Sequence, residues 1–236
     1  LLQRQRWCCA CGLRDIGWAR RLSEFGTRNG QTTRDFFRFV VGLEGEFGPD
    51  NRFSWDVSYN YGRTTESQVS NGQVNVQNFR NALNVIADPV SGQLICADSI
   101  ARAQGCVPAN IFGNGTVSQA AVNYIAADQN FQTDIQQSVF AANVSGALFA
   151  LPGGDVAAAV GFEYRRENSS ENNDALTNAG LNAGNKIGDT RGAFDVAELY
   201  GELNIPILSD VPGADLLSVN LSGRVSDYST VGTVYS

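Results

Sequence analysis

The chain has 236 residues, of which 43% are hydrophobic and 10% aromatic, a composition that argues against a globally disordered protein. Its net charge of −7 at pH 7 argues against a nucleic-acid partner, because phosphate binding needs clustered Lys and Arg. No window approaches the roughly 20 consecutive apolar residues of a membrane helix, which excludes a helical membrane protein; a transmembrane β-barrel, whose strands need only about 9–11 residues, stays open.

The first segment, residues 1–18, follows no strand pattern, and we treat it as atypical. Cys8 and Cys11 have a C-x-x-C spacing, which can indicate zinc or redox chemistry. A four-ligand zinc site lacks partners, however, because the chain has no second such pair and no His. We therefore expect no metal site and no cofactor. Because the chain begins with Leu and contains no Met, we also expect a fragment or a processed piece.

Residues 34–47 and 53–64 predict the first β-hairpin. Apolar and polar side chains alternate along both, and successive side chains of a strand point to opposite faces. The intervening GPDNR (48–52) has the composition of a tight turn. On one face we expect Phe39, Val41, Leu43, Trp55, Val57 and Tyr59, and on the other Arg38, Glu44, Glu46, Asp56 and Asn60.

Two more hairpins follow the same plan. Strands are expected near 139–149 and 156–167, and near 194–207 and 216–228. Their apolar face carries Phe162, Leu203 and Leu221, and their polar face carries Glu163, Arg165, Glu198, Glu202 and Arg224. The fold class is therefore all-β, with about six antiparallel strands.

The connections between these hairpins, residues 65–135 and 168–193, are long and polar, whereas the turns within them are short. Compact soluble domains usually have short connections throughout, while outer-membrane barrels have short turns at one rim and long loops at the other. The arrangement favours a transmembrane barrel. Within the first loop, residues 76–89 and 118–130 have the apolar spacing of short helices, and Ser118 could cap the second.

Several segments resemble the barrel of the TonB-dependent outer-membrane receptors, and the resemblance covers Ala19 to Ser236. It rests on their order along the chain: RRLSEFGTR (20–28), FRFVVGLEGEF (37–47), FSWDVSYNYGRT (53–64), GCVPANIFG (105–113) and VAELYGELNIPIL (196–208). The family implies a barrel of about twenty-two strands around an N-terminal plug, with a short segment that contacts TonB. Neither the plug nor that segment is visible, so residues 19–236 are expected to be a partial barrel.

The resemblance implies an outer-membrane location, with membrane lipid, TonB and a small nutrient as partners. The nutrient could be a ferric siderophore, cobalamin or a glycan, and the ligand-binding residues are unknown. In an oxidising compartment Cys96 and Cys106, inside the long loop, are expected to form a disulfide, worth about 2–3 kcal/mol in the chain-entropy model. Two free thiols are the alternative.

No catalytic site is expected. The carboxylates are scattered over several strands without a nucleophile beside them, and a Ser-His-Asp arrangement cannot form without His. The charged residues of the polar face are instead expected to line a water-filled lumen, and the apolar residues to face lipid. A passive porin and a secreted soluble β-sandwich that binds a ligand are the alternative functions.

Overall fold

The computed structural model describes residues 19–212 and 214–236, so the expectation for residues 1–18 lies outside the described part. The chain divides into two compact units. We call Gln31–Val69, Asn130–Asp174 and Ile187–Ser236 the wall unit. We call residues 19–30, Ser70–Gln129 and Ala175–Lys186 the loop unit.

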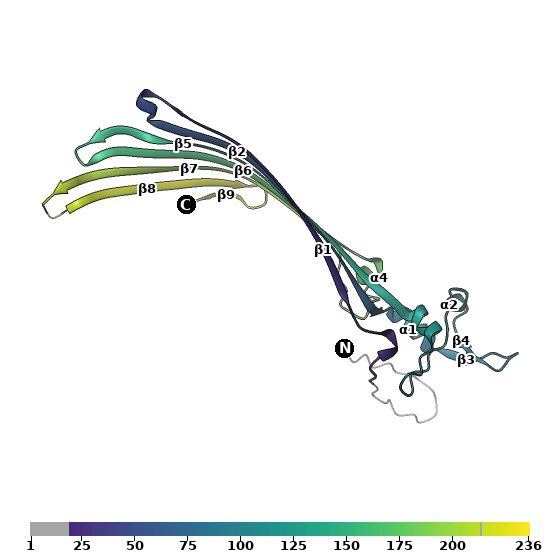
Figure 1. The fold of residues 1–236 in the computed structure, drawn as a ribbon. Helices are drawn as coiled ribbons and strands as arrows, with labels where there is room; N and C mark the ends of the chain where they lie inside the picture. Colours follow the sequence, from purple (N-terminus) through teal and green to yellow (C-terminus); the bar gives the residue numbers. More distant parts are fainter. Residues whose placement is uncertain (1–18, 213) are drawn as a thin grey trace. The chain divides into compact units, whose positions relative to one another are not determined.

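The wall unit is built on one seven-stranded sheet in the order β1-β2-β5-β6-β7-β8-β9, whose strands are labelled in Figure 1. Its strands are β1 (Gly30–Phe47), β2 (Phe53–Val74), β5 (Ala126–Leu151), β6 (Gly154–Asn173), β7 (Thr190–Val211), β8 (Ala214–Tyr228) and β9 (Gly232–Tyr235). The sheet is open, with β1 and β9 at its edges. A short 3-10 turn, Pro49–Asn51, joins β1 to β2.

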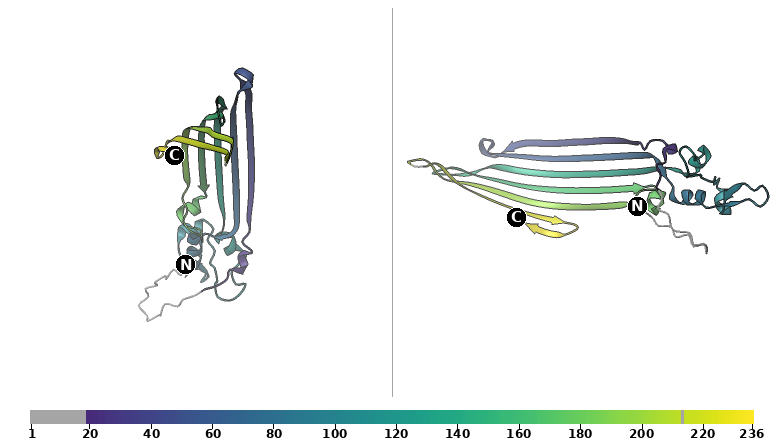
Figure 2. Two further views of the ribbon diagram at one scale, coloured as in Figure 1. Left: turned by 90° about the vertical axis from the view of Figure 1, so that its left-hand side faces the viewer. Right: turned by 90° about the horizontal axis from the view of Figure 1, so that it is seen from below.

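Neighbouring strands are antiparallel. Each pair from β5 to β9 has an antiparallel register, for example Phe162↔Leu199 between β6 and β7. β1 and β2 are also antiparallel. Arg34, near the start of β1, contacts Glu66, late in β2, whereas Phe47, at the end of β1, contacts Phe53, at the start of β2. The expected all-β, antiparallel fold is confirmed, and Figure 2 shows the long strands running side by side.

The strands are longer than the sequence pattern predicts. β2 continues to Val74 and β5 already begins at Ala126, so the loop expected over 65–135 is confined to 75–125. The loop expected over 168–193 is likewise confined to 174–189. Apolar alternation fades at the polar run TTESQVSNGQV (64–74), but backbone hydrogen bonding to a neighbouring strand does not need apolar side chains. The prediction located the apolar parts of the strands, not their ends.

The loop unit contains α1 (Val76–Leu83), a hairpin of β3 (Val85–Ala87) and β4 (Leu94–Cys96), α2 (Ser99–Ala103), α3 (Gln119–Ile125) and α4 (Ala175–Ala179), together with the 3-10 turn η1 (Ser23–Phe25). The two predicted helices exist as α1 and α3 but end earlier than expected. Ser118 caps α3, since its hydroxyl accepts a hydrogen bond from the Ala121 N–H at 3.2 Å. Among the described residues, no helix is long and apolar enough to cross a membrane.

A small apolar core holds the loop unit together. Its buried members are Val74, Ala82, Val117, Ala121, Val122 and Ile125. The segment around α4 joins this core through the backbone, because the Val76 N–H donates to the Leu181 carbonyl at 2.7 Å. Inside that segment, the buried Asn182 side chain donates to Thr177 Oγ1 at 2.7 Å. The unit is therefore assembled from segments that are distant in sequence.

The segment that precedes β1 is held to the rest of the loop unit by the contacts of Arg20 and Glu24. Arg20 forms an ion pair with Glu24 and donates to Thr116 Oγ1 at 3.1 Å. The Glu24 carboxylate also accepts the Val117 N–H at 3.4 Å. The pKa of Glu24 lies below its ordinary value, chiefly because its own backbone N–H bonds the carboxylate, and the Val117 amide and the Arg20 charge act in the same direction.

Replacing Ile125 by Ala should destabilise the loop unit by about 2–5 kcal/mol, because Ile125 is fully buried and the change leaves a cavity. The matched control is Ile100→Ala, at a side chain that is 68% exposed, and its cost should stay within about 0.5 kcal/mol. Hydrogen exchange of the α3 amides in the purified protein measures the difference. Equal protection in the two variants would show that this core does not hold the unit together.

Candidate functional site

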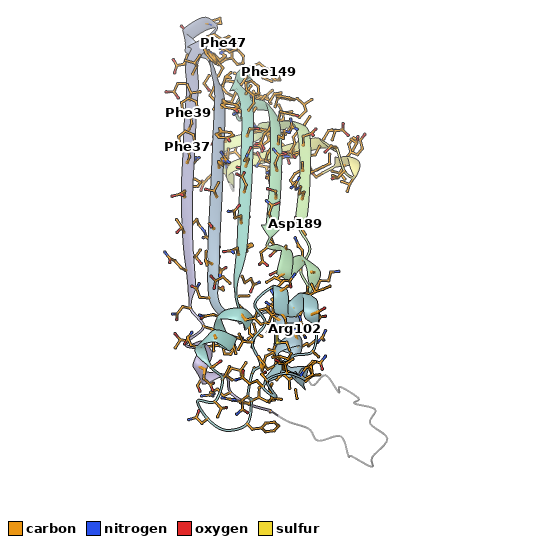
Figure 3. The ribbon with its side chains drawn as sticks, turned by 90° about the vertical axis from the view of Figure 1, so that its right-hand side faces the viewer. Phe37, Phe39, Phe47, Arg102, Phe149 and Asp189 are labelled. Carbon is orange, nitrogen blue, oxygen red and sulfur yellow. A yellow bond between two sulfur atoms is a disulfide. The ribbon has the colours of Figure 1, made fainter. Side chains whose placement is uncertain are left out.

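The wall unit presents one apolar face. The register places Phe162 opposite Leu199, and Leu203 opposite Leu221, all on the same side of the sheet. Ring contacts between Phe37 and Tyr61 extend this side to β1 and β2. All the side chains expected on the apolar face share this side: Phe39, Val41, Leu43, Trp55, Val57, Tyr59, Phe162, Leu203 and Leu221. Figure 3 marks Phe37, Phe39 and Phe47 along β1.

Much of this apolar face is exposed. Leu43 is 68% exposed and Leu221 56%, and Phe39 and Val41 are each about half exposed. A shallow hollow of about 420 Å³ lies in it, with lining that includes Trp55, Val144 and Phe162. Exposed apolar area spread over so many strands is far more than a soluble monomer usually carries, and it is typical of a membrane or partner surface.

The apolar face is a band with limits. On β2 it runs from Phe53 to Tyr61, which fits the roughly 9–11 residues of a transmembrane strand. Phe53 stacks on Phe47 at one limit, with ring centroids 5.3 Å apart. Two residues beyond Tyr61, on the same side of the strand, Arg63 forms an ion pair with Asp134 at 2.5 Å. On this side of β2 the side chains thus change from aromatic at Tyr61 to charged at Arg63, the next residue on the same side.

The opposite face is mainly polar, although Phe36 and Val40 of β1 also lie on it. Glu163 lies opposite Glu198 in the register, Tyr200 lies opposite Arg224, and Arg38 donates to Asn60 Oδ1 at 3.1 Å. All the residues expected on the polar face share this side: Arg38, Glu44, Glu46, Asp56, Asn60, Glu163, Arg165, Glu198, Glu202 and Arg224. Direct opposition of Glu163 and Glu198 is unfavourable by itself. Arg224, whose Nη1 lies 3.8 Å from Glu198 Oε1, offsets part of it.

A chain of polar contacts crosses this face from β2 to β8. Asn143 donates through Nδ2 to Asp56 Oδ2 at 2.8 Å, and Asn143 Oδ1 accepts the Tyr200 hydroxyl at 2.5 Å. The Arg224 guanidinium lies 5.0 Å from the centre of the Tyr200 ring, within the range of a cation–π contact. Glu198, which is almost fully buried, accepts the Ser226 hydroxyl at 2.6 Å.

Gly161 makes this series of polar contacts possible. Tyr200 lies on β7 and Asn143 on β5, so their hydrogen bond passes over β6, where Gly161 is the residue between them. A Cβ at position 161 would overlap both the Tyr200 ring and Asn143 Oδ1. A glycine inside a strand often marks a place where another group approaches the backbone closely.

The chain matches the family described as "TonB dependent receptor-like, beta-barrel" over residues 12–236. This chain belongs to the TonB-dependent receptors. They are outer-membrane transporters, not enzymes. The match begins at residue 12, within the segment that we treat as atypical. No curated protein matches the chain significantly.

In this TonB-dependent receptor the disulfide lies in the loop unit. Cys96 and Cys106 are bonded, with Cα atoms 6.3 Å apart. Arg102, labelled in Figure 3, donates to the Cys96 carbonyl at 2.5 Å and so adds a second link across the ring. Cys96 is fully buried, whereas the chain just before Cys106 is exposed.

Alternation alone does not single out Asn143, Tyr200 or Ser226 as site residues. Their faces follow from alternation, but their contacts depend on which strands are neighbours and on the register between them. The one usable signal was Gly161, the single glycine between Asp155 and Asn173, where every other residue has a Cβ.

Gly161→Ala should lower the stability of the receptor's barrel by about 1–3 kcal/mol, because the methyl group displaces Tyr200 and breaks its bond to Asn143. The control is Gly201→Ala, where an added Cβ comes no closer than 3.7 Å to another atom. Urea unfolding of the full-length receptor in detergent measures both. If the two variants unfold alike, Gly161 has no special role in accommodating Tyr200.

Proposed function

We propose that this chain forms part of the barrel wall of an outer-membrane transporter that binds a scarce nutrient and imports it with energy transmitted by TonB. The observation that carries the proposal is the exposed apolar band, which lies opposite a mainly polar face in a member of this family. A passive porin would need the same two faces, so the energy source separates the two functions.

In this proposal the apolar band faces lipid and the polar face lines the lumen. The band supports this assignment in two ways. First, its length along β2 suits the thickness of the hydrocarbon core. Second, aromatic side chains lie at both of its limits: Phe47 and Phe53 at one, Tyr59 and Tyr61 at the other. The strands of such a barrel pair all their backbone groups with each other, which lipid requires because it offers no hydrogen-bond partners.

The loop unit is proposed to lie outside the cell, because the long loops of outer-membrane barrels do so. Its disulfide suits an oxidising compartment. The polar face, which carries charges of both signs, is proposed to contact the plug and the passing nutrient. Ferric siderophores, cobalamin and glycans are the nutrient classes that the family resemblance implies.

Uptake assays can test the energy source. In cells that express the full-length receptor as their sole copy, accumulation of a labelled nutrient from one of these classes should fall to background when TonB is deleted. A strain that carries TonB but lacks the receptor gives the baseline. Accumulation that continues unchanged without TonB would reject active import and favour a passive pore.

Val57→Arg should destabilise the folded barrel in lipid vesicles by about 2–4 kcal/mol if Val57 lies near the middle of the bilayer. Ser58→Arg, one residue along β2 and on the polar face, is the matched control and should cost much less. Folding equilibria in urea measure both costs. Equal costs would argue against the assignment of the two faces to lipid and water.

A further inference from the structure

The loop unit contains a shallow, open depression of about 560 Å³, which we call the cleft and to which the proposed function assigns no role. Three elements of this unit form it: α1, the turn that follows α2, and α3. Its lining residues are Asn78, Gln104, Gly105, Val107, Ala120, Asn123 and Tyr124. None of them is charged, and four carry a side chain that can form hydrogen bonds.

Hydrogen bonds to neighbouring groups of the loop unit orient the polar side chains of the cleft. Asn78 Nδ2 donates to the Tyr124 carbonyl at 2.7 Å, which fixes the orientation of the Asn78 amide. Asn123 Oδ1 accepts from Gln119 Nε2 at 2.9 Å, so Nδ2 of Asn123 keeps its donors for another partner. The Tyr124 hydroxyl lies 3.4 Å from Asn81 Nδ2. Donors and acceptors that are already oriented lower the entropy cost of binding.

The disulfide fixes one wall of the cleft. Gln104 and Gly105 lie inside the ring closed by Cys96 and Cys106. α2 ends there because Gly105 adopts a φ of +87°, the left-handed conformation that commonly terminates a helix. The Gln104 N–H still bonds the Ile100 carbonyl at 3.0 Å, and the Cys106 N–H bonds that of Ala101 at 2.9 Å.

The chemistry of the lining selects a class of ligand. Amides and a phenol both donate and accept, as sugar hydroxyls do, and the Tyr124 ring with Val107 and Ala120 offers apolar surface to the C–H face of a sugar ring. An anionic ligand would need a cation. Arg102, one turn away, is already bonded to the carbonyls of Cys96 and Ala97.

We propose that this cleft binds a neutral, hydroxyl-rich ligand, a saccharide, as a capture site of the receptor. The inference rests on the proposed function, since it names the nutrient class among those that the family resemblance leaves open. It follows from the uncharged, amide-lined surface and from its placement in the loop unit.

The test uses the purified full-length receptor in detergent, with maltotriose, cellotriose, xylotriose and chitotriose as probes and saturation-transfer NMR as the readout. At least one trisaccharide should bind saturably. Asn123→Asp removes the free donors and adds a charge, and it should weaken that binding at least tenfold. Asn114→Asp, at an exposed position outside the lining, is the matched control and should leave the affinity unchanged. Because Asn123 is also exposed, neither change should disturb folding.

Two outcomes overturn the inference: no trisaccharide binds, or binding survives Asn123→Asp with the affinity of the control. TonB-dependent uptake of a siderophore or of cobalamin alone would then leave the proposed function standing without the saccharide site. If Asn123→Asp abolishes saccharide binding but uptake is the same with and without TonB, the saccharide site stands and active import is rejected.

Discussion

The two-residue period of an extended backbone is the constraint on which the wall unit depends. It allows a single strand to carry two surfaces of opposite character, and the sheet then aligns those surfaces across neighbours. A slip of one residue along the full length of a strand would move its apolar side chains to the polar face. The short hairpin turns prevent such a slip, for instance the one at Pro49–Asn51, and so does the Phe47–Phe53 stack beside it.

The face of most strand residues could be predicted from the sequence because alternation is a local property, although the register shifts at Leu148 and Ile207 interrupt it. Arg38, Asp56 and Glu198 were all assigned to one face from their neighbours in sequence, and in the structure they lie on the same side of the sheet. Strand ends were predicted less well. The extension of β2 from Thr65 to Val74 depends on hydrogen bonds to other strands, and no local apolar signal accompanies it.

The loop unit was predictable only in part, for a related reason. The apolar spacing of α1 and α3 and the cap at Ser118 are local and could be read from the sequence. The cleft depends on three segments meeting, and its amides look like ordinary surface residues when each is read alone. Ile125 shows the same limit, since its full burial depends on partners from η1 and α1.

The contact of Tyr200 across Gly161 has a consequence for sequence variation among relatives. The three positions 143, 161 and 200 share one space, so their identities should not vary independently. A relative with any larger residue at position 161 should carry a smaller side chain at 200, and the amide at 143 would then need another partner or give way to an apolar residue. Tyrosine at 200 should therefore occur together with glycine at 161. This pair of residues would mark the pairing of β6 with β7, which the alternation within either strand does not reveal.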